Sequence, residues 1–285
     1  MITDTFDGYL RRLGVIDPGA PSIEGLFALQ RAHLERVSYD NVEIQLGRPP
    51  GMDPEGAARR VADGLGGYCY HLNGAFALLL ETLGYDVTRH SGGVYGDAAS
   101  REVNGEHLAL TVRVDGEAYW VDVGLGDGPY EPLPLREGTY EQGGFRYAMR
   151  PLEPMEGEGP GWSLLSPDMH MPRMNFRGAP AATADFRAKH TWLSTSEDSP
   201  FVRTLALFRR DARGVDVLRG RVLRRIDAAE VTSERELGTA EEFHEVLSTV
   251  FRRPGDDLSP ADRAALWERV DRAHTGWLAS RPRTD

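Results

Sequence analysis

The stretch LGGYCYHLNGAFALLLETLG, residues 65–84, is the most informative part of the chain. Its apolar residues recur at helical spacing and predict a buried helix that ends near Gly84, a residue type favoured just after a helix. The residues on this buried face are Leu72, Phe76, Leu79, Leu80 and Leu83. Cys69 lies on the same face in the first turn, so we expect its thiol to point inward. Gly66 and Gly67 allow a sharp backbone turn just before it.

Cys69 is the only cysteine of the chain, which excludes an internal disulfide and a multi-cysteine metal site. The N-terminus of a helix stabilises negative charge and therefore favours the reactive thiolate at this position. A lone cysteine is nevertheless more often a buried structural residue, and its position alone favours that interpretation. A second segment of the sequence changes the balance.

This second segment is a predicted hairpin. Residues 108–114 and 119–123 alternate as strands do, and the dipeptide Asp-Gly at 115–116 is a strong signal for a two-residue turn. Such a turn places Ala109 opposite Asp122. The face that carries Leu108, Leu110, Val112 and Val114 belongs to the core, whereas the other face carries ionisable groups.

His107 lies on the same face as Ala109 and is therefore a diagonal neighbour of Asp122, within plausible reach of its carboxylate. Each residue alone has an ordinary explanation, as a hydrogen-bonded strand histidine and a surface carboxylate. Together with Cys69 they supply the three groups of a Cys-His-Asp triad. In a triad the thiolate attacks an acyl carbonyl, the imidazole moves the protons, and the carboxylate orients the imidazole. This chemistry serves a cysteine hydrolase and an acyltransferase equally well.

Composition narrows the class of protein. The chain has 285 residues, of which 40% are hydrophobic, and this is ordinary for a protein that buries a real core. Its net charge of -11 argues against nucleic acid or an anionic membrane as the main partner. No apolar stretch approaches a membrane span, and the first residues do not resemble a secretory signal. We therefore expect a soluble, cytoplasmic protein.

Other candidate sites are weaker. The glycine-rich residues 124–128 follow a predicted strand without a βαβ unit, so they do not predict a dinucleotide site. They form either a plain turn or a loop that approaches a pantetheine or phosphate. The histidines show no metal-ligand spacing, and we expect no metal. Residues 209–210 and 219–225 are basic but interleaved with strand residues, which favours a solvated face over a nucleic-acid site.

The coarse pattern has a helical first third, a β-rich middle from about Tyr85, and a tail of strands and helices. Helices are expected at residues 23–36, 53–65 and 69–83. In the tail, strands are expected at 201–208 and 214–226, and helices at 240–251 and 260–277.

At these motifs the chain resembles the arylamine N-acetyltransferase family. The family element R-G-G-Y/F-C-F/Y-E-x-N corresponds to Leu65–Asn73, and the family histidine precedes a strand, as His107 does. The element D-V-G-F-G corresponds to Asp122–Gly126. An F-E-N-like element stands at Tyr39–Asn41, and the S-T-x-P-x-S-x-F segment at Ser194–Phe201. The resemblance therefore spans almost the whole chain, with the motifs in the right order.

The resemblance implies an α+β fold with a cysteine-protease-like catalytic core. Residues 1–85 would form an N-terminal helical bundle that carries the nucleophile. Residues 86–195 would form a central β-barrel that carries His107 and Asp122, and residues 196–285 an α/β lid.

The resemblance also implies a ping-pong reaction in which Cys69 takes an acetyl group from acetyl-CoA, or another acyl group from its acyl-CoA, and passes it to an arylamine or hydrazine. By motif, Tyr39, Val94 and Leu125 would line the acceptor pocket, and Gly126 would lie near the pantetheine arm. The partner is then a small-molecule amine, with no nucleic acid, membrane or metal involved.

Several residues depart from the family pattern. Leu65 replaces an arginine, His71 a glutamate, Leu125 the aromatic residue of D-V-G-F-G, and Glu197 a proline, while Asp40 stands where glutamate is usual. Most of these changes flank the nucleophile or the pocket. The alternative is therefore an amide synthase that takes a polyketide or other acyl chain from an acyl carrier protein. A hydrolase, or a non-enzymatic protein on the same scaffold, fits the motifs less well.

Overall fold

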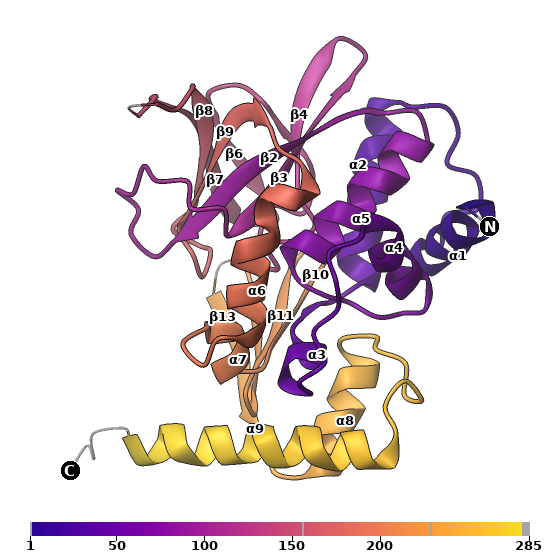
Figure 1. Cartoon of the computed structure of the whole chain (residues 1–285), viewed down its shortest axis with the longest axis vertical. Coiled ribbons are helices and arrows are strands. Elements are labelled where there is room, and N and C mark those ends of the chain that lie inside the picture. The colour runs from indigo at the N-terminus through magenta and orange to yellow at the C-terminus, as the bar shows by residue number, and fades with distance from the viewer. Residues whose placement is uncertain (1, 156, 229, 281–285) are drawn as a thin grey trace.

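The computed structural model describes residues 2–155, 157–228 and 230–280, and its N-terminal part consists of helices (Figure 1). These are α1 (Ile2–Leu13), α2 (Ile23–Arg36), α3 (Val42–Gln45), α4 (Pro54–Ala62) and α5 (Cys69–Thr82). Polar side chains begin two of them, because the Ser22 hydroxyl accepts the Gly25 N–H of α2 and the Asp53 carboxylate accepts the Gly56 N–H of α4. No described helix is long and apolar enough to cross a membrane.

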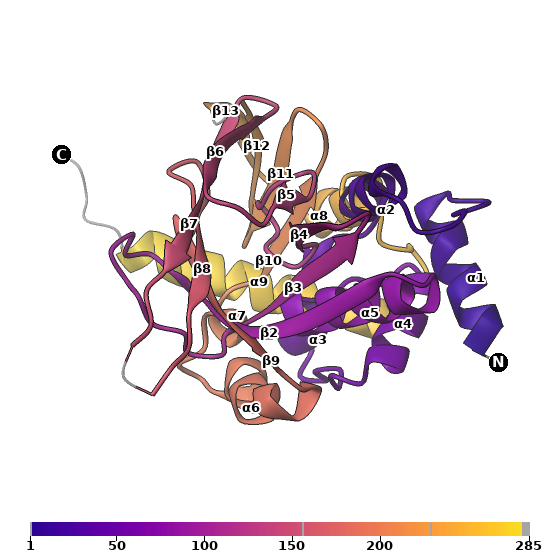
Figure 2. The same cartoon turned by 90° about the horizontal axis from the view of Figure 1, so that it is seen from above.

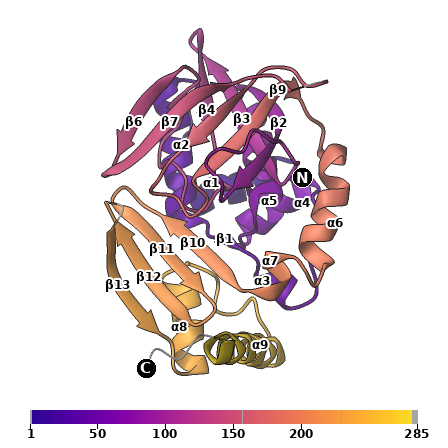
Figure 3. The same ribbon diagram turned by 90° about the vertical axis from the view of Figure 1, so that its left-hand side faces the viewer.

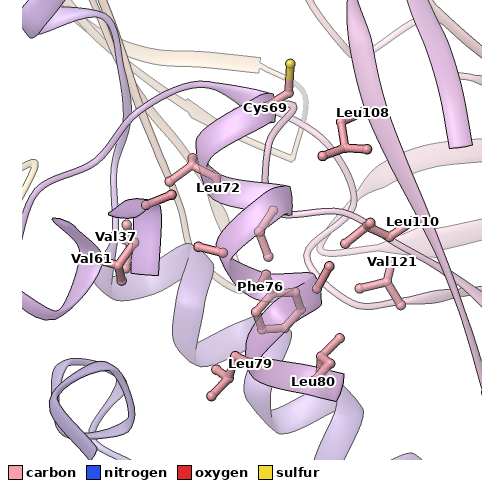
Figure 4. Packing of buried hydrophobic residues seen from close by; sticks show 14 of the residues in the cluster. Val37, Val61, Cys69, Leu72, Phe76, Leu79, Leu80, Leu108, Leu110 and Val121 are labelled. Atoms are coloured by element: carbon pink, nitrogen blue, oxygen red, sulfur yellow. The ribbon is translucent and has the colours of Figure 1, made fainter. Parts of the chain in front are cut away.

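Helix α5 is the centre of this part. Figure 4 shows its apolar side chains packed against strand residues such as Leu108, Leu110 and Val121, with the Cys69 sulfur at the first turn. Only 4% of Cys69 is exposed, so the prediction of an inward thiol is confirmed. The predicted end is confirmed too, because Leu83 caps the helix and Gly84 follows with a φ of +93°.

The middle of the chain forms an eight-stranded antiparallel sheet that curls into a nearly closed barrel (Figure 2). The strand order is β5-β4-β3-β2-β9-β8-β7-β6. The strands are β2 (Asp86–Tyr95), β3 (His107–Val114), β4 (Glu117–Val121), β5 (Leu133–Pro134), β6 (Gly138–Gln142), β7 (Phe145–Leu152), β8 (Gly161–Leu165) and β9 (Arg173–Pro180). A core around Trp120, Phe145 and Phe176 lies inside this sheet.

The β3–β4 hairpin has the predicted register. Leu110 pairs with Val121 and Val112 with Tyr119 across a two-residue turn. Both turn residues have positive φ, 52° for Asp115 and 81° for Gly116, as this turn type requires. Consequently the residues just beyond the paired ends, which include His107 and Asp122, come together.

The C-terminal part contains a second antiparallel sheet, ordered β1-β10-β11-β12-β13. Its strands are β1 (Tyr39–Asp40), β10 (Ala206–Arg210), β11 (Gly214–Arg219), β12 (Val222–Asp227) and β13 (Glu230–Glu236). Helices α8 (Ala240–Thr249) and α9 (Pro260–Ser280) lie beside it, and α6 (Arg187–Thr195) and α7 (Pro200–Arg203) connect it to the barrel (Figure 3). Because β1 comes from the helical part, this sheet is joined to the segment just before the nucleophile.

Three predicted elements need correction. Residues 201–208 were expected to form one strand, but Ser199 caps a short helix that starts at Pro200, and β10 begins only at Ala206. Residues 214–226 form two strands, because the chain turns at Gly220. The helix expected at 53–65 ends at Ala62.

The fold class itself is confirmed, with a helical N-terminal part, a barrel-like sheet and an α/β C-terminal part. The division after residues 85 and 195 stays a prediction.

Candidate active site

Cys69 is the first residue of helix α5, and its surroundings are tightly packed. Its Sγ lies 3.4 Å from the carbonyl oxygen of Glu106, the residue before His107. On its other side, a Cβ on Gly124 would lie 2.6 Å from the Cys69 Cα. The thiol is therefore held between the start of β3 and the loop after β4.

His107 and Asp122 form a buried ion pair beside this thiol. The His107 Nε2 lies 2.5 Å from the Asp122 Oδ2, and His107 also hydrogen-bonds the Cys69 side chain. Burial alone lowers the pKa of His107, but the Asp122 charge and the bonds to Asp122 and Cys69 outweigh it and raise the pKa to about 10. The geometry thus favours an imidazolium next to the sulfur at neutral pH.

Two polar side chains, which sequence reasoning missed, fix the loop after β4. The Asn73 side chain accepts the Val123 N–H at 2.8 Å and donates to the Leu108 carbonyl at 2.7 Å. The Gln30 Oε1 accepts the Asp122 N–H at 3.2 Å. The signal for Asn73 was its place in the element around Cys69, four residues after the nucleophile and so on the same helix face.

A cavity of about 320 Å³ opens beside Cys69 and His107. Its lining is mostly apolar and includes Tyr39, Val94 and Leu125, three of the four predicted binding residues. The other lining residues are Glu106, Gly124, Asp127, Met169, His170, Met171, Leu193, Pro200, Phe201, Thr204, Ala206, Phe208 and Arg219. Sequence reasoning missed most of these, because they come from β10, β11, α6 and the 166–172 loop, whose position depends on the tertiary fold.

Gly126, the fourth predicted binding residue, is not part of the lining. It packs against Phe208, since a Cβ at Gly126 would lie 2.8 Å from the Phe208 ring, and its φ is +82°. A glycine is needed here for both reasons. Its predicted role near a pantetheine arm stays a prediction.

The residues that depart from the family pattern have definite places. His71 lies outside the main cavity, where its Nδ1 accepts the Tyr68 N–H at 3.4 Å and thereby caps α5. Burial, and then the His190 charge, lower the pKa of His71 to about 3, so this ring is neutral. Asp40 lies 3.5 Å from the buried Arg253, a cation supplied by the C-terminal part.

The basic residues expected to form a solvated face are divided. Arg210 is 1% exposed, contrary to the prediction, and its guanidinium lies 4.3 Å from the Phe145 ring centre. Arg219 lines the cavity. Within the described part of the chain, no group of three or more His, Cys, Asp or Glu is arranged to hold a metal ion.

Comparisons with known proteins agree on one family. Residues 22–253 match the model of a family described as N-acetyltransferase. An arylamine N-acetyltransferase from Mycolicibacterium smegmatis is 30% identical over 261 residues, which cover 88% of this chain and 91% of that protein. The proansamycin X synthase of Amycolatopsis mediterranei (strain S699) is 34% identical over 149 residues, but the match covers only 50% of this chain and 56% of the synthase.

Solved structures agree with this result. The Nocardia farcinica arylamine N-acetyltransferase superposes with a TM-score of 0.82 at 30% identity, over 93% of this chain and 95% of that one. The Mycobacterium marinum enzyme, solved in complex with CoA, superposes with a TM-score of 0.81 at 26% identity, over 94% and 99% of the two chains.

Proposed function

The chain belongs to the arylamine N-acetyltransferase family, and from this premise we propose that it transfers an acetyl or other acyl group from acyl-CoA, through a thioester at Cys69, to an aromatic amine or hydrazine. The observation that carries the proposal is the buried His107–Asp122 pair, 2.5 Å apart, beside a thiol at the wall of an apolar cavity.

In the first half-reaction, the Cys69 thiolate attacks the acyl carbonyl of the donor. The new C–S bond forms as the bond to the CoA sulfur breaks, and the CoA thiolate leaves with a proton from the His107 imidazolium. The N-terminal end of α5 stabilises the attacking thiolate. The product is S-acyl Cys69 and free CoA.

In the second half-reaction, an amine enters the cavity and attacks the thioester. Neutral His107 accepts a proton from the amine nitrogen as the C–N bond forms and the C–S bond breaks. The step returns the Cys69 thiolate and the His107 imidazolium. Asp122 acts through His107 in both directions, because it fixes the tautomer and stabilises the charged ring.

The cavity suits an aromatic or otherwise apolar acceptor. Tyr39, Phe201 and Phe208 supply aromatic surface to the cavity that Cys69 also lines. Tyr39 is in edge-on contact with both phenylalanines. A reducing compartment such as the cytoplasm keeps the thiol free for this chemistry.

The test is the intact mass of the protein after it is mixed with acetyl-CoA alone. We expect one acetyl adduct, which is absent in Cys69→Ala and disappears when an arylamine is added. The amide product must appear in the same amount. If a reactive Cys69 gains no adduct, acetyl-CoA is not its donor.

A second candidate is an amide synthase that takes its acyl chain from an acyl carrier protein. The specific observation is that Leu125, at a position where the family pattern has an aromatic residue, lines the cavity together with the flexible side chains of Met169 and Met171. The half-length match to a proansamycin X synthase supports it. Incubation with a carrier protein loaded with a long acyl chain distinguishes the two, since only this candidate predicts transfer from the carrier but not from acetyl-CoA.

A further inference from the structure

One arginine that lines the apolar cavity, Arg219, has no acidic partner among the described residues. The Arg219 Nη1 lies 2.9 Å from the His170 Nε2. Among the described residues, this neutral ring is the hydrogen-bond partner of the Arg219 guanidinium. Neighbouring arginines differ, because Arg209 on β10 pairs with Asp216 at 2.7 Å, and Arg221 in the turn after β11 pairs with Asp271 at 2.7 Å. The Arg219 charge is thus available to a ligand.

The position of Arg219 follows from the strand register. Phe208 pairs with Tyr39, which lines the cavity together with Cys69. Arg219 pairs with Ala206, which precedes Phe208 by two residues in β10. Side chains two residues apart share a face and lie about 7 Å apart. Arg219 therefore lies on the same face of the sheet as Phe208. It is displaced from the Tyr39–Phe208 pair by two residues along the strands.

His170 holds the guanidinium in place. The backbone N–H of His170 donates to the Asp127 Oδ2 at 2.5 Å. This bond anchors the 166–172 loop to the loop after β4. Partial burial, and then the Arg219 charge, lower the pKa of His170 and so favour its neutral ring. Because a guanidinium only donates, the His170 Nε2 accepts the hydrogen bond from Arg219. Two loops thus orient one cationic group over the cavity.

We propose that Arg219, positioned by His170, recognises an anionic group at the end of the ligand that lies away from Cys69. The inference rests on the proposed acyl transfer and adds a substrate class, namely an apolar or aromatic body that ends in a carboxylate or phosphate. Two sources can supply that anion, the acceptor amine through a carboxylate or the donor through a phosphate. A guanidinium binds either through paired N–H donors.

The acceptor arm of the test uses a matched pair, 4-(4-aminophenyl)butanoate and its neutral primary amide, with 4-aminobenzoate as a shorter acid. For Arg219→Gln we expect kcat/KM to fall about tenfold with the long acid and to stay unchanged with the amide. The shorter acid is expected to lose less. Arg219→Lys should recover part of the loss. The control is Arg213→Gln, which removes the same charge from the exposed turn at the other end of the β10–β11 hairpin.

The donor arm compares acetylation of Cys69 by acetyl-CoA with acetylation by the neutral ester 4-nitrophenyl acetate. If Arg219→Gln slows only the reaction with acetyl-CoA, the donor phosphate is the anion that Arg219 recognises. If Arg219→Gln and Arg213→Gln behave alike in both arms and in the binding measurement that follows, the proposal is overturned.

A binding measurement separates this proposal from the proposed function. 4-Phenylbutyrate and 4-phenylbutyramide contain no reactive amine, and their protection of Cys69 from iodoacetamide needs no turnover. Stronger protection by the acid, lost in Arg219→Gln, supports the anion site even if acetyl-CoA never acetylates Cys69. Equal protection by acid and amide, together with no effect of Arg219→Gln in either kinetic arm, overturns it.

Discussion

Gly124 lies directly against the backbone of Cys69. A Cβ at this position would be 2.6 Å from the Cys69 Cα, 3.0 Å from its Cβ and 3.1 Å from the Asn73 Nδ2. The first two atoms belong to the backbone and Cβ of Cys69 and cannot move aside. The third belongs to the Asn73 amide, which is fixed by its hydrogen bond to the Leu108 carbonyl. The loop after β4 and the start of α5 therefore fit together only with a glycine here.

Gly124→Ala is expected to displace the nucleophile from His107. A shift of about 1 Å at a reacting group lowers rates by about 100-fold, and we expect a loss of this size in the acetylation of Cys69, measured by mass spectrometry over time. Gly74→Ala is the control, since its Cβ would meet nothing closer than 4.0 Å. Alanine there favours the helix by up to about 1 kcal/mol, so this variant should keep its rate and unfold at higher urea. Equal rates in the two variants would show that the contact at Gly124 does not position Cys69.

Asp122→Asn tests the ion pair. The amide keeps the size of the side chain but removes the charge, so the pKa of His107 should fall from about 10 because burial is then opposed by Cys69 without the Asp122 charge. We expect acyl transfer to fall by about a thousandfold or more, as it does when a triad loses its carboxylate. Single-turnover transfer from the acetylated protein to an amine measures this loss, and a change below tenfold would contradict the role proposed for Asp122.

The same pair predicts a pH profile. In the wild type His107 stays protonated as the pH rises until about 10, so alkylation of Cys69 by iodoacetamide should be nearly constant between pH 7 and about 9. Without the charge of Asp122, the rate should instead rise steadily over that range. Initial alkylation rates at several pH values check this, with parallel curves for wild type and Asp122→Asn as the contrary outcome.

Arg253 connects the C-terminal part to the segment before the nucleophile. This guanidinium, 3% exposed, lies 2.7 Å from Glu43, 2.6 Å from Asp257 and 3.5 Å from Asp40. Arg253→Met removes this cation from all three carboxylates, of which Glu43 keeps its pair with Arg48 at 2.6 Å. Breaking a buried pair in this way costs about 3–5 kcal/mol of unfolding free energy.

Urea unfolding measures the effect of Arg253→Met. Arg59→Met is the matched control, because Arg59 is exposed and lies 3.9 Å from its acidic neighbours. Exposed pairs of this kind contribute less than about 1 kcal/mol. A loss as small for Arg253 as for Arg59 would mean that the buried cluster adds little to stability.

Part of the site could be predicted because local rules determine it. The Asp-Gly turn allows one register for β3 and β4, and that register brings His107 to Asp122. Helical periodicity likewise placed Cys69 at a buried helix start. These relationships depend on residues close in sequence.

The other wall of the cavity depends on contacts between distant segments. Phe208 and Arg219 reach the site only because β10 pairs with the two residues of β1. No local sequence pattern predicts a pairing between segments so far apart in the chain. The error at residues 201–208 has a local cause, since Ser199 and Pro200 form a helix start that the apolar run concealed. The sequence pattern predicts Arg210 on a solvated face, because strand alternation alone does not show which face of a sheet packs against another part of the fold.

His33 predicts how the fold responds to acid. The ring is fully buried between Tyr9 and Phe76, and neither of its nitrogens has a hydrogen-bond partner among the described residues. Burial, and then the Arg12 charge, lower the pKa of His33 to about 3, whereas an unfolded histidine titrates near 6.5. Between these values the unfolded chain binds more protons, so the unfolding free energy is unaffected above pH 6.5 and decreases as the pH falls toward 3.

His33→Leu removes this pH dependence of the unfolding free energy, because it replaces the titrating ring with an apolar side chain of similar size. At pH 5, about 1.5 units below the unfolded pKa, the group accounts for about 2 kcal/mol of lost stability. Between pH 7.5 and pH 5 the wild type should therefore lose about 2 kcal/mol more than His33→Leu, as measured by urea unfolding at both values. Because His71 remains buried in both proteins, it contributes equally and cancels in the comparison. An equal loss in the two proteins would mean that His33 finds a partner or becomes hydrated when it is protonated in the fold.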